Sequence, residues 1–318
     1  MTDREIHELQ VPPEHGGERL DQAATGLFPG YSRARLQKWI RDGALTVDGE
    51  AWRPSRKLSG GERLRLEAIL EAEGAVAPQD LPLDILFEDQ EILIINKPAG
   101  LVVHPAAGNR DGTLQNALLH FDAQLDTLPR SGIVHRLDKD TTGVMVVART
   151  PRAHASLVEQ LQRRDMSRVY EAVVHGSVPG PGTVDAPIGR HPVDRKRMAV
   201  VEHGGKPAVS HFRVLQRFAH FSHVEVALES GRTHQIRVHM QHLGWPVLGD
   251  PTYGRKLSGV KTMSATVVEA ARGFPRQALH ARSLKLLHPG DGRPRAFSAP
   301  LPADLLALLE LLAQDDRS

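Results

Sequence analysis

The sequence predicts an α+β fold in two parts: a small N-terminal α/β module and a larger domain built on a mixed or antiparallel sheet. In the second part long strand-like segments outnumber helical ones, which does not suit regular βαβ winding. An abrupt change of composition separates the two parts, and 318 residues suffice for two hydrophobic cores. We therefore expect a first domain at residues 1–76 and a second at residues 77–318.

The first part has the pattern of two helices followed by a hairpin. One helix is expected near residues 19–27, and a second begins after the possible cap Ser32 and ends at Gly43. The pair Asp48-Gly49 then gives a strong two-residue turn signal. Residues 17–66 carry ten Lys or Arg and six Asp or Glu, which is a local excess of positive charge.

Four of these basic residues crowd the second helix, namely Arg33, Arg35, Lys38 and Arg41. A face of this kind can neutralise nucleic-acid phosphates, but a solvated helix carries the same charges. The formal charge of the whole chain is only +2, so net charge does not separate the two interpretations.

The two parts are joined by a connector, residues 67–91, which contains eight acidic residues, two prolines and neither Lys nor Arg. We expect a flexible tether there that does not itself bind nucleic acid. Strands are expected at 84–88, 91–95, 168–175, 208–218 and 220–229, and helices at 114–119, 153–162, 233–243 and, as an amphipathic helix, 301–312.

Composition excludes several classes of protein. The chain has no cysteine, which rules out disulfides and thiolate-ligated zinc, and its first five residues hold no signal-peptide core. No apolar run approaches the roughly 20 residues of a membrane span. Spacings typical of a nucleophile elbow, a phosphate loop or a dinucleotide fingerprint are missing too. We expect a cytoplasmic protein without membrane contact.

The stretch from Gly132 to Ala148 is the most informative, because two β-branched runs in it are separated by six charged or hydroxyl residues and a histidine. Arg136 and Asp138 share one face if a strand continues through them, and enzymes hold nucleophiles and bases beside cations in this way. A structural ion pair is the alternative. A metal site using His135, Asp138 and Asp140 is not expected, because a strand directs His135 and Asp138 to opposite faces.

Three later strings also carry polar groups beside apolar ones. Tyr170 lies in a strand whose alternate positions are apolar, which is typical of a core tyrosine with a satisfied hydroxyl. Thr233 is a possible helix cap, and the spacing of His234, Arg237 and Gln241 puts them on one side of that helix. By itself this would be an exposed basic face. Leu279, in Gln-Ala-Leu-His-Ala, would by itself be ordinary core.

Two of these regions resemble known families. The string His-Arg-Leu-Asp-Lys-Asp-Thr-Thr-Gly at 135–143 resembles the signature of the RluA/RluD-type pseudouridine synthases. In the first part, Gly-Glu-Arg-Leu-Asp, Ser-Arg, Trp-Ile and Val-Asp-Gly resemble the S4-type RNA-binding domain, with Asp48 where that family more often has Asn. The resemblance implies a pseudouridine synthase domain behind an S4-like module, and it favours RNA binding by the basic helix.

The resemblance also implies roles for individual residues. Asp138 would be the essential carboxylate, Arg237 its partner, and Tyr170 would lie against the target base. Substrate contacts would come from Leu279 and His135, and from Arg136, which would fill the space that the flipped base leaves. Whether Asp138 attacks C1′, attacks C6 or assists elimination through a glycal stays open.

The reaction that the resemblance implies is an isomerisation, which breaks the N1–C1′ bond of uridine and joins C5 to C1′, so no cofactor is required. Strings at 96–105 and 187–192 resemble the RluD-type subgroup. That resemblance implies large-subunit (23S) ribosomal RNA or a pre-ribosomal particle as the partner, with helix 69 as the target. We expect a monomer. The alternatives are a non-catalytic RNA-binding ribosome-assembly factor and, more distantly, a metal-dependent hydrolase.

Overall fold

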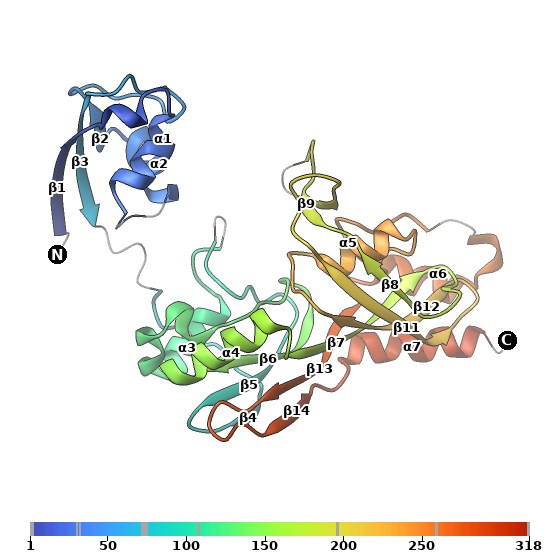
Figure 1. Cartoon of the computed structure of the whole chain (residues 1–318). Helices are drawn as coiled ribbons and strands as arrows, with labels where there is room; N and C mark the ends of the chain where they lie inside the picture. The colour runs from blue at the N-terminus through green and yellow to red at the C-terminus, as the bar shows by residue number, and fades with distance from the viewer. Residues whose placement is uncertain are drawn as a thin grey trace. The chain divides into compact units, whose positions relative to one another are not determined.

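The computed structural model describes residues 3–29, 31, 33–70, 76–106, 109–194, 197–257 and 260–316. The chain forms two compact units, Met1–Ala75 and Val76–Ser318, and the described residues of each enclose a separate apolar core (Figure 1). Each unit is described by itself below.

The first unit is a three-stranded antiparallel sheet with two helices packed on it. The strand order is β1 (Asp3–Gln10), β3 (Arg63–Leu70) and β2 (Leu45–Val47). A 3-10 turn, η1 (Pro13–His15), precedes the helices α1 (Leu20–Leu27) and α2 (Arg33–Arg41), whose apolar residues complete the core. Both helices confirm the sequence prediction, although the expected cap Ser32 lies outside the described residues.

The Asp48-Gly49 turn forms as its sequence predicts. Both residues have positive φ, 51° and 83°, and Val47 and Glu50 exchange backbone hydrogen bonds of 2.9 Å across it. A positive φ at both central positions is the geometry that Asp-Gly tolerates and most other pairs do not.

The connector differs from the expected flexible tether at both of its described ends. Its first residues, up to Leu70, continue strand β3 of the first unit. Its later part is fixed to the second unit, because the Asn116 side chain donates a hydrogen bond of 2.8 Å to the Ala77 carbonyl and the backbone amide of Gly112 donates one of 2.6 Å to the Gln79 side-chain oxygen. Acidic composition therefore indicated the boundary but not the local structure.

The second unit is organised around a nine-stranded mixed sheet, which confirms the predicted fold class. Along the sheet the strands are β4 (Ile85–Glu88), β5 (Ile92–Lys97), β6 (Thr142–Ala148), β13 (Leu279–Leu287), β7 (Ser167–His175), β12 (Phe221–Leu228), β11 (Val209–Arg217) and β8 (Gly182–Asp185), and β14 (Pro294–Ser298) also pairs with β13. Among the described strands, β6 and β13 pair in parallel and the other neighbours are antiparallel. β9 (Ile188–Arg190) and β10 (Met198–Val200) form a separate small sheet.

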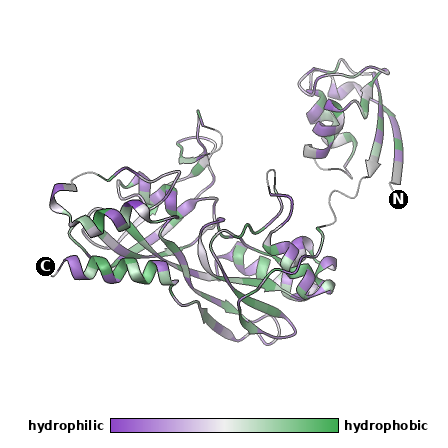
Figure 2. Cartoon of the chain, turned by 180° about the vertical axis from the view of Figure 1, so that it is seen from behind, coloured by the Kyte–Doolittle hydropathy of each residue, from purple (hydrophilic) through white to green (hydrophobic). Residues whose placement is uncertain are grey.

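Helices cover the large sheet. In Figure 1, α3 (Leu114–Phe121) and α4 (Pro151–Arg163) lie over the half of the sheet that contains β5 and β6, and α5 (Gln235–His242) lies over the half that contains β11. The short turns η2 (Ala123–Thr127), η3 (Pro129–Gly132) and η4 (Val260–Thr262) and the helices α6 (Ala265–Gly273) and α7 (Ala303–Asp315) complete the unit. Figure 2 shows hydrophobic residues concentrated in the strands of the sheet and alternating with polar ones along α7. In the described part of the chain, no helix has the length and apolar character needed to cross a membrane.

A fork in the sheet positions the loop before β6. Strand β13 pairs with β6 at only two registers, His280 with Thr142 and Ala281 with Gly143, and continues beside β14 from Ser283 onward. Gly143 has a φ of 116°, and a Cβ atom there would lie 2.2 Å from the Ala281 carbonyl oxygen. Only glycine permits this approach. The loop ending at Thr141 is therefore held against strand β13.

Candidate active site

A cleft of about 620 Å³ opens beside this fork. Its walls come from residues 133–138, from β7, from residues 228–237 and from Leu279 on β13. The volume lies in the range of small-molecule sites, and the walls mix apolar side chains with several charged ones. Segments distant in sequence thus combine to form one site.

The loop that carries Asp138 is not a strand, which corrects the prediction that Arg136 and Asp138 share a strand face. After a bridge from Ile133 to Val147 the chain bends, and Leu137 is buried in the core as an anchor. Arg136 and Asp138 both line the cleft nevertheless. The expected shared side of Arg136 and Asp138 is thus kept without a strand, because Leu137 between them is buried.

Asp138 is held by an arginine from the opposite wall. Arg237 on α5 donates a hydrogen bond of 2.9 Å from Nη1 to Oδ2 of Asp138. The same guanidinium donates from Nε and Nη2 to the two oxygens of Asp250, at 2.6 and 2.9 Å. Asp250 also accepts hydrogen bonds from the backbone amides of Thr252 and Tyr253. These hydrogen bonds fix one edge of the Arg237 guanidinium, and the remaining nitrogen, Nη1, is directed at Asp138.

The surroundings of Arg237 and Asp250 keep both side chains charged. Burial opposes the charge of Arg237, but hydrogen bonds and attraction from Asp250 and Asp138 raise its pKa above the ordinary value. Burial would raise the pKa of Asp250, yet the hydrogen bonds and charge of Arg237 outweigh it and keep that pKa low. Sequence reasoning missed Asp250, because it follows a short turn 13 residues from Arg237 and belongs to no periodic element.

His234 completes the surroundings of the carboxylate. Its Nε2 lies 3.9 Å from Oδ1 of Asp138, and its Nδ1 is 2.9 Å from the Tyr253 hydroxyl. That hydroxyl accepts a hydrogen bond from the Met198 amide, so its own proton is available to His234. The proton of a neutral His234 then resides on Nε2, facing Asp138.

Helix α5 begins differently from the prediction. His234, with a φ of 57°, is the N-cap in place of Thr233, and no side chain caps it in the usual way. The side chain of Gln235 instead accepts from the Arg232 amide at 2.9 Å. Gln241 is exposed and does not line the cleft, so only His234 and Arg237 of the expected row reach Asp138.

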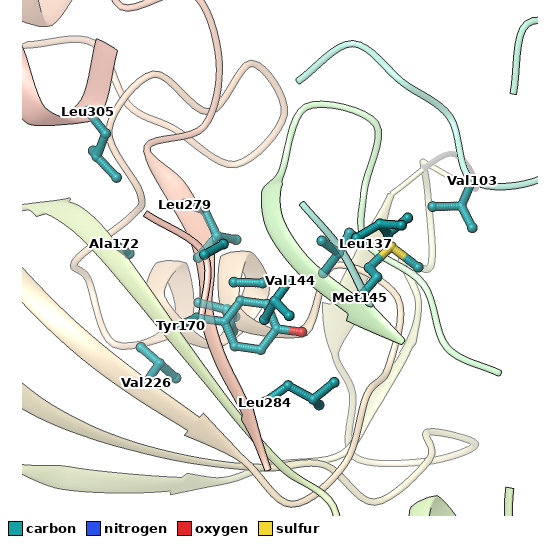
Figure 3. Close-up of a cluster of buried hydrophobic side chains, with 14 of the residues drawn as sticks. Val103, Leu137, Val144, Met145, Tyr170, Ala172, Val226, Leu279, Leu284 and Leu305 are labelled. Atoms are coloured by element: carbon teal, nitrogen blue, oxygen red, sulfur yellow. The ribbon is translucent and has the colours of Figure 1, made fainter. Parts of the chain in front are cut away.

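Tyr170 and Leu279 form an apolar wall of the cleft. Tyr170 on β7 pairs with Ala281 of β13, and Leu279 pairs with Ala172. Figure 3 shows the Tyr170 ring among buried side chains that include Val144 and Leu284, with its hydroxyl on the side where Leu137 lies. In the part of the chain that is described, this hydroxyl makes no hydrogen bond. The structure therefore differs from the pattern of a satisfied core tyrosine.

His135 also lines the cleft but points partly back into the fold. Its Nε2 accepts a hydrogen bond of 3.1 Å from the Val146 amide. Burial, with a contribution from the charge of Arg168, lowers the pKa of His135 to about 3. The ring is therefore neutral, and its other nitrogen carries the proton.

Comparison with known proteins identifies the family. Residues 91–242 match the family model for RNA pseudouridylate synthase, and residues 18–64 match that of the S4 domain. Ribosomal large subunit pseudouridine synthase D of Pseudomonas aeruginosa is 56% identical over 99% of this chain and 98% of its own length. The chain belongs to the RNA pseudouridylate synthase family. It is an isomerase that converts uridine in RNA to pseudouridine.

Further relatives agree with this pseudouridine synthase assignment. The proteins with the same name from Xanthomonas campestris and Escherichia coli are 52% and 50% identical, over 98% and 94% of this chain and 94% and 92% of their own lengths. The solved structure of human RNA pseudouridylate synthase domain containing 4 has a TM-score of 0.56 and 28% identity, covering 72% of this chain and 93% of its own. The sequence prediction of the family and of its S4 domain is confirmed.

A buried lysine stiffens the loop of the synthase that carries Asp138. The ammonium group of Lys97 donates to the carbonyls of Pro98, Leu101 and Lys139, at 2.7, 3.0 and 2.8 Å. Burial lowers its pKa to about 7, against the attraction of Asp140 and Asp138. Lys97 lies within the string at 96–105 but was assigned no role of its own from the sequence, because nothing local indicates that its side chain reaches residue 139.

The residues considered for a metal do not converge in the synthase. Among the described residues no group of three His, Asp or Glu side chains is arranged to hold an ion. His135 is engaged with the β6 backbone, while Asp138 is engaged with Arg237.

The basic helix α2 of the S4 domain presents Lys38 and Arg41 to solvent. The Arg35 guanidinium lies 5.5 Å from the centre of the Trp39 ring. The side chain of Arg33 is outside the described part of the structure. All four residues lie within the matched S4 segment.

Proposed function

We propose that this synthase modifies specific uridines of large-subunit ribosomal RNA, with the loop of helix 69 as its target. The proposal is supported by relatives named for the large ribosomal subunit, which are 50 to 56% identical over nearly the whole chain. A loop also suits the chemistry. Bases there are partly unstacked and cost less to flip, while an RNA duplex hides its base edges in a narrow major groove.

The observation that carries the proposed mechanism is the Asp138 carboxylate, which Arg237 fixes in the wall of a cleft of about 620 Å³, large enough for one nucleoside. In the proposed reaction Asp138 assists cleavage of the N1–C1′ bond. The freed uracil turns in the cleft and C5 bonds to C1′. The proton on C5 leaves to solvent and N1 takes up a proton, so the reaction needs no redox partner or cofactor. Asp138 acts as a nucleophile or as a base on the sugar.

The walls of the cleft have separate roles in this proposal. Tyr170 and Leu279 hold the uracil against the apolar wall while it is detached, and the Tyr170 hydroxyl exchanges a proton with it. Burial raises the pKa of that hydroxyl, which keeps it protonated. His135, neutral in the cleft, contacts the substrate through its free N–H. Arg136, which is exposed at the rim, fills the space left in the RNA by the flipped base.

The S4 domain supplies affinity without reading sequence. Arg33, Arg35, Lys38 and Arg41 of α2 bind phosphates of the stem beside the target loop. Residues 1–76 act in this view as a separable RNA-binding domain, and residues 77–318 act as the catalytic domain. The groups of the proposed reaction belong to one chain, so a monomer suffices. A substrate in the ribosome also implies work in the cytoplasm.

Pseudouridine mapping tests the proposal. Ribosomal and transfer RNA from cells with and without the gene are treated with carbodiimide and read by primer extension. Loss of pseudouridine from helix 69 is expected in cells without the gene, and Asp138→Asn should fail to restore it. Loss confined to transfer RNA would contradict the ribosomal assignment and leave the reaction class intact.

A further inference from the structure

Arg168 on β7 is a buried cation that has no carboxylate partner among the described residues. Only 7% of its surface is exposed, and its Nε has no hydrogen-bond partner in the described structure. Its Nη2 makes one long hydrogen bond, 3.4 Å, to the carbonyl of Glu229. Within the described residues no Asp or Glu oxygen lies at ion-pair distance from Arg168. The nearby Glu229 carboxylate is engaged by Arg164 and His211.

Such an arrangement is costly for a protein that binds nothing there. A guanidinium does not lose its proton in a protein, so it cannot escape the cost of burial by becoming neutral. The fold nevertheless makes room for it. A Cβ atom on Gly231 would lie 2.5 Å from Nη1 of Arg168, so the glycine leaves the space that the guanidinium occupies. The fold therefore provides a defined position for the Arg168 guanidinium, although burying it there does not stabilise the free protein.

Arg168 also lies beside Tyr170 in the cleft. Arg168 and Tyr170 are two residues apart on β7, so both side chains extend from the same face of the strand, with Cα atoms about 7 Å apart. Both line the cleft. A nucleotide whose base lies on Tyr170 would bring a backbone phosphate to this distance, and arginine pairs with phosphate through two parallel N–H donors.

We propose that Arg168 binds one phosphodiester next to the target uridine, and that this phosphate supplies the anion that the folded chain lacks. The inference rests on the proposed function, since it takes RNA as the ligand. The free Nε and an Nη nitrogen donate to two phosphate oxygens. The contact fixes the flipped nucleotide by its backbone while Tyr170 and Leu279 hold its base.

Neutralising single phosphates tests the contact. A helix 69 stem-loop is synthesised with a methylphosphonate at each position around the target in turn, and single-turnover rates are measured with parent, Arg168→Gln and Arg213→Gln proteins. Arg213 is a matched control, being exposed, paired with Glu225 and outside the cleft. Losing one charge-assisted contact should lower kcat/KM about 10- to 100-fold. At one position the methylphosphonate should slow the reaction of the parent by a similar factor, but it should not slow the reaction of Arg168→Gln any further. If the rate losses from Arg168→Gln and from the methylphosphonate combine independently at every position, the proposal is overturned.

Two further measurements do not depend on turnover. The affinity for an unmodified large-subunit ribosomal RNA transcript is measured against salt, and the log–log slope should be shallower by about 0.7 to 0.9 for Arg168→Gln than for the parent. Without RNA, Arg168→Met should melt no lower than the parent, because it removes an unpaired buried charge. A lower Tm with an unchanged salt slope would show that Arg168 supports the fold and does not bind phosphate. If the parent modifies no RNA, the proposed function fails, and the salt slope still decides the role of Arg168.

Discussion

Replacing Asp250 with asparagine is the sharpest test of how the site is assembled. The substitution keeps the size of the side chain but places an amide where Oδ1 and Oδ2 now accept four hydrogen bonds. One amide oxygen can still accept from the backbone, but the NH₂ group then faces a donor nitrogen of Arg237. The variant therefore leaves a buried cation with one fewer anion and an unpaired donor.

The expected magnitude follows from burial. Removing one partner of a buried ion pair costs about 3 to 5 kcal/mol of unfolding free energy. Arg237 keeps its contact with Asp138, so we expect the lower end, about 3 kcal/mol, which corresponds to a Tm lower by about 6 to 12 °C for a domain of this size. The chemical step should slow about 10- to 100-fold as Arg237 loses its fixed orientation.

Glu225→Gln provides a matched control. Glu225 also binds an arginine through two hydrogen bonds, from Nε and Nη2 of Arg213, but that arginine is 60% exposed. Exposed pairs contribute at most about 1 kcal/mol, so this variant should melt near the parent and react at its rate. Melting is followed by circular dichroism, and single-turnover rates are measured well below the Tm. Equal stability and equal rates for the two variants would refute the proposed role of Asp250.

Three further predictions use other parts of the molecule. Tyr170→Phe should bind RNA like the parent but react about 10² to 10⁴ times more slowly in single turnover, and equal rates would mean that the hydroxyl has no chemical role. Deleting residues 1–76 should leave a folded synthase domain whose RNA affinity depends less on salt, by about 0.7 to 0.9 in slope per lost phosphate contact; an unchanged slope would mean that the S4 domain does not touch RNA. Burial lowers the pKa of His135 to about 3 in the folded protein, whereas in the unfolded chain the pKa of histidine is about 6.5. As pH falls below about 6.5, His135 is therefore protonated in the unfolded chain but not in the folded one, and the folded state loses stability. His135→Gln keeps an acceptor for the Val146 amide, so its urea midpoint should fall less between pH 7 and pH 5 than that of the parent, and parallel losses would contradict the assignment.

Many strands of the large sheet and most helices could be predicted because their causes are local, whereas β8, β13 and β14 were not predicted. The β-branched runs at 144–147 and 168–175 are strands in the structure, and the helix predicted at 114–119 begins at the cap Thr113. Strand β1 was missed, because its sequence Asp-Arg-Glu-Ile-His-Glu-Leu-Gln alternates charged and apolar residues only weakly, and its pairing with β3 is what makes it a strand.

The site was predictable only through resemblance. Asp138 and Arg237 are 99 residues apart and meet across a cleft, so no periodicity joins them. Asp250 and Lys97 act through hydrogen bonds to residues of other segments, which local patterns do not encode. The bend after Ile133 and the left-handed backbone of His234 were not predicted, for a related reason. Both are fixed by contacts of the folded unit and oppose the local preference of the residues involved.

The central claim is that the Asp138 carboxylate performs the isomerisation. The direct measurement is release of tritium from ribosomal RNA labelled at C5 of uridine, because the C5 proton leaves when C5 bonds to C1′. The parent should release one tritium for each pseudouridine formed. Asp138→Asn keeps the shape of the side chain and should bind the same RNA with similar affinity, but release no tritium over many turnover times of the parent. Repeated turnover by that variant would contradict the account.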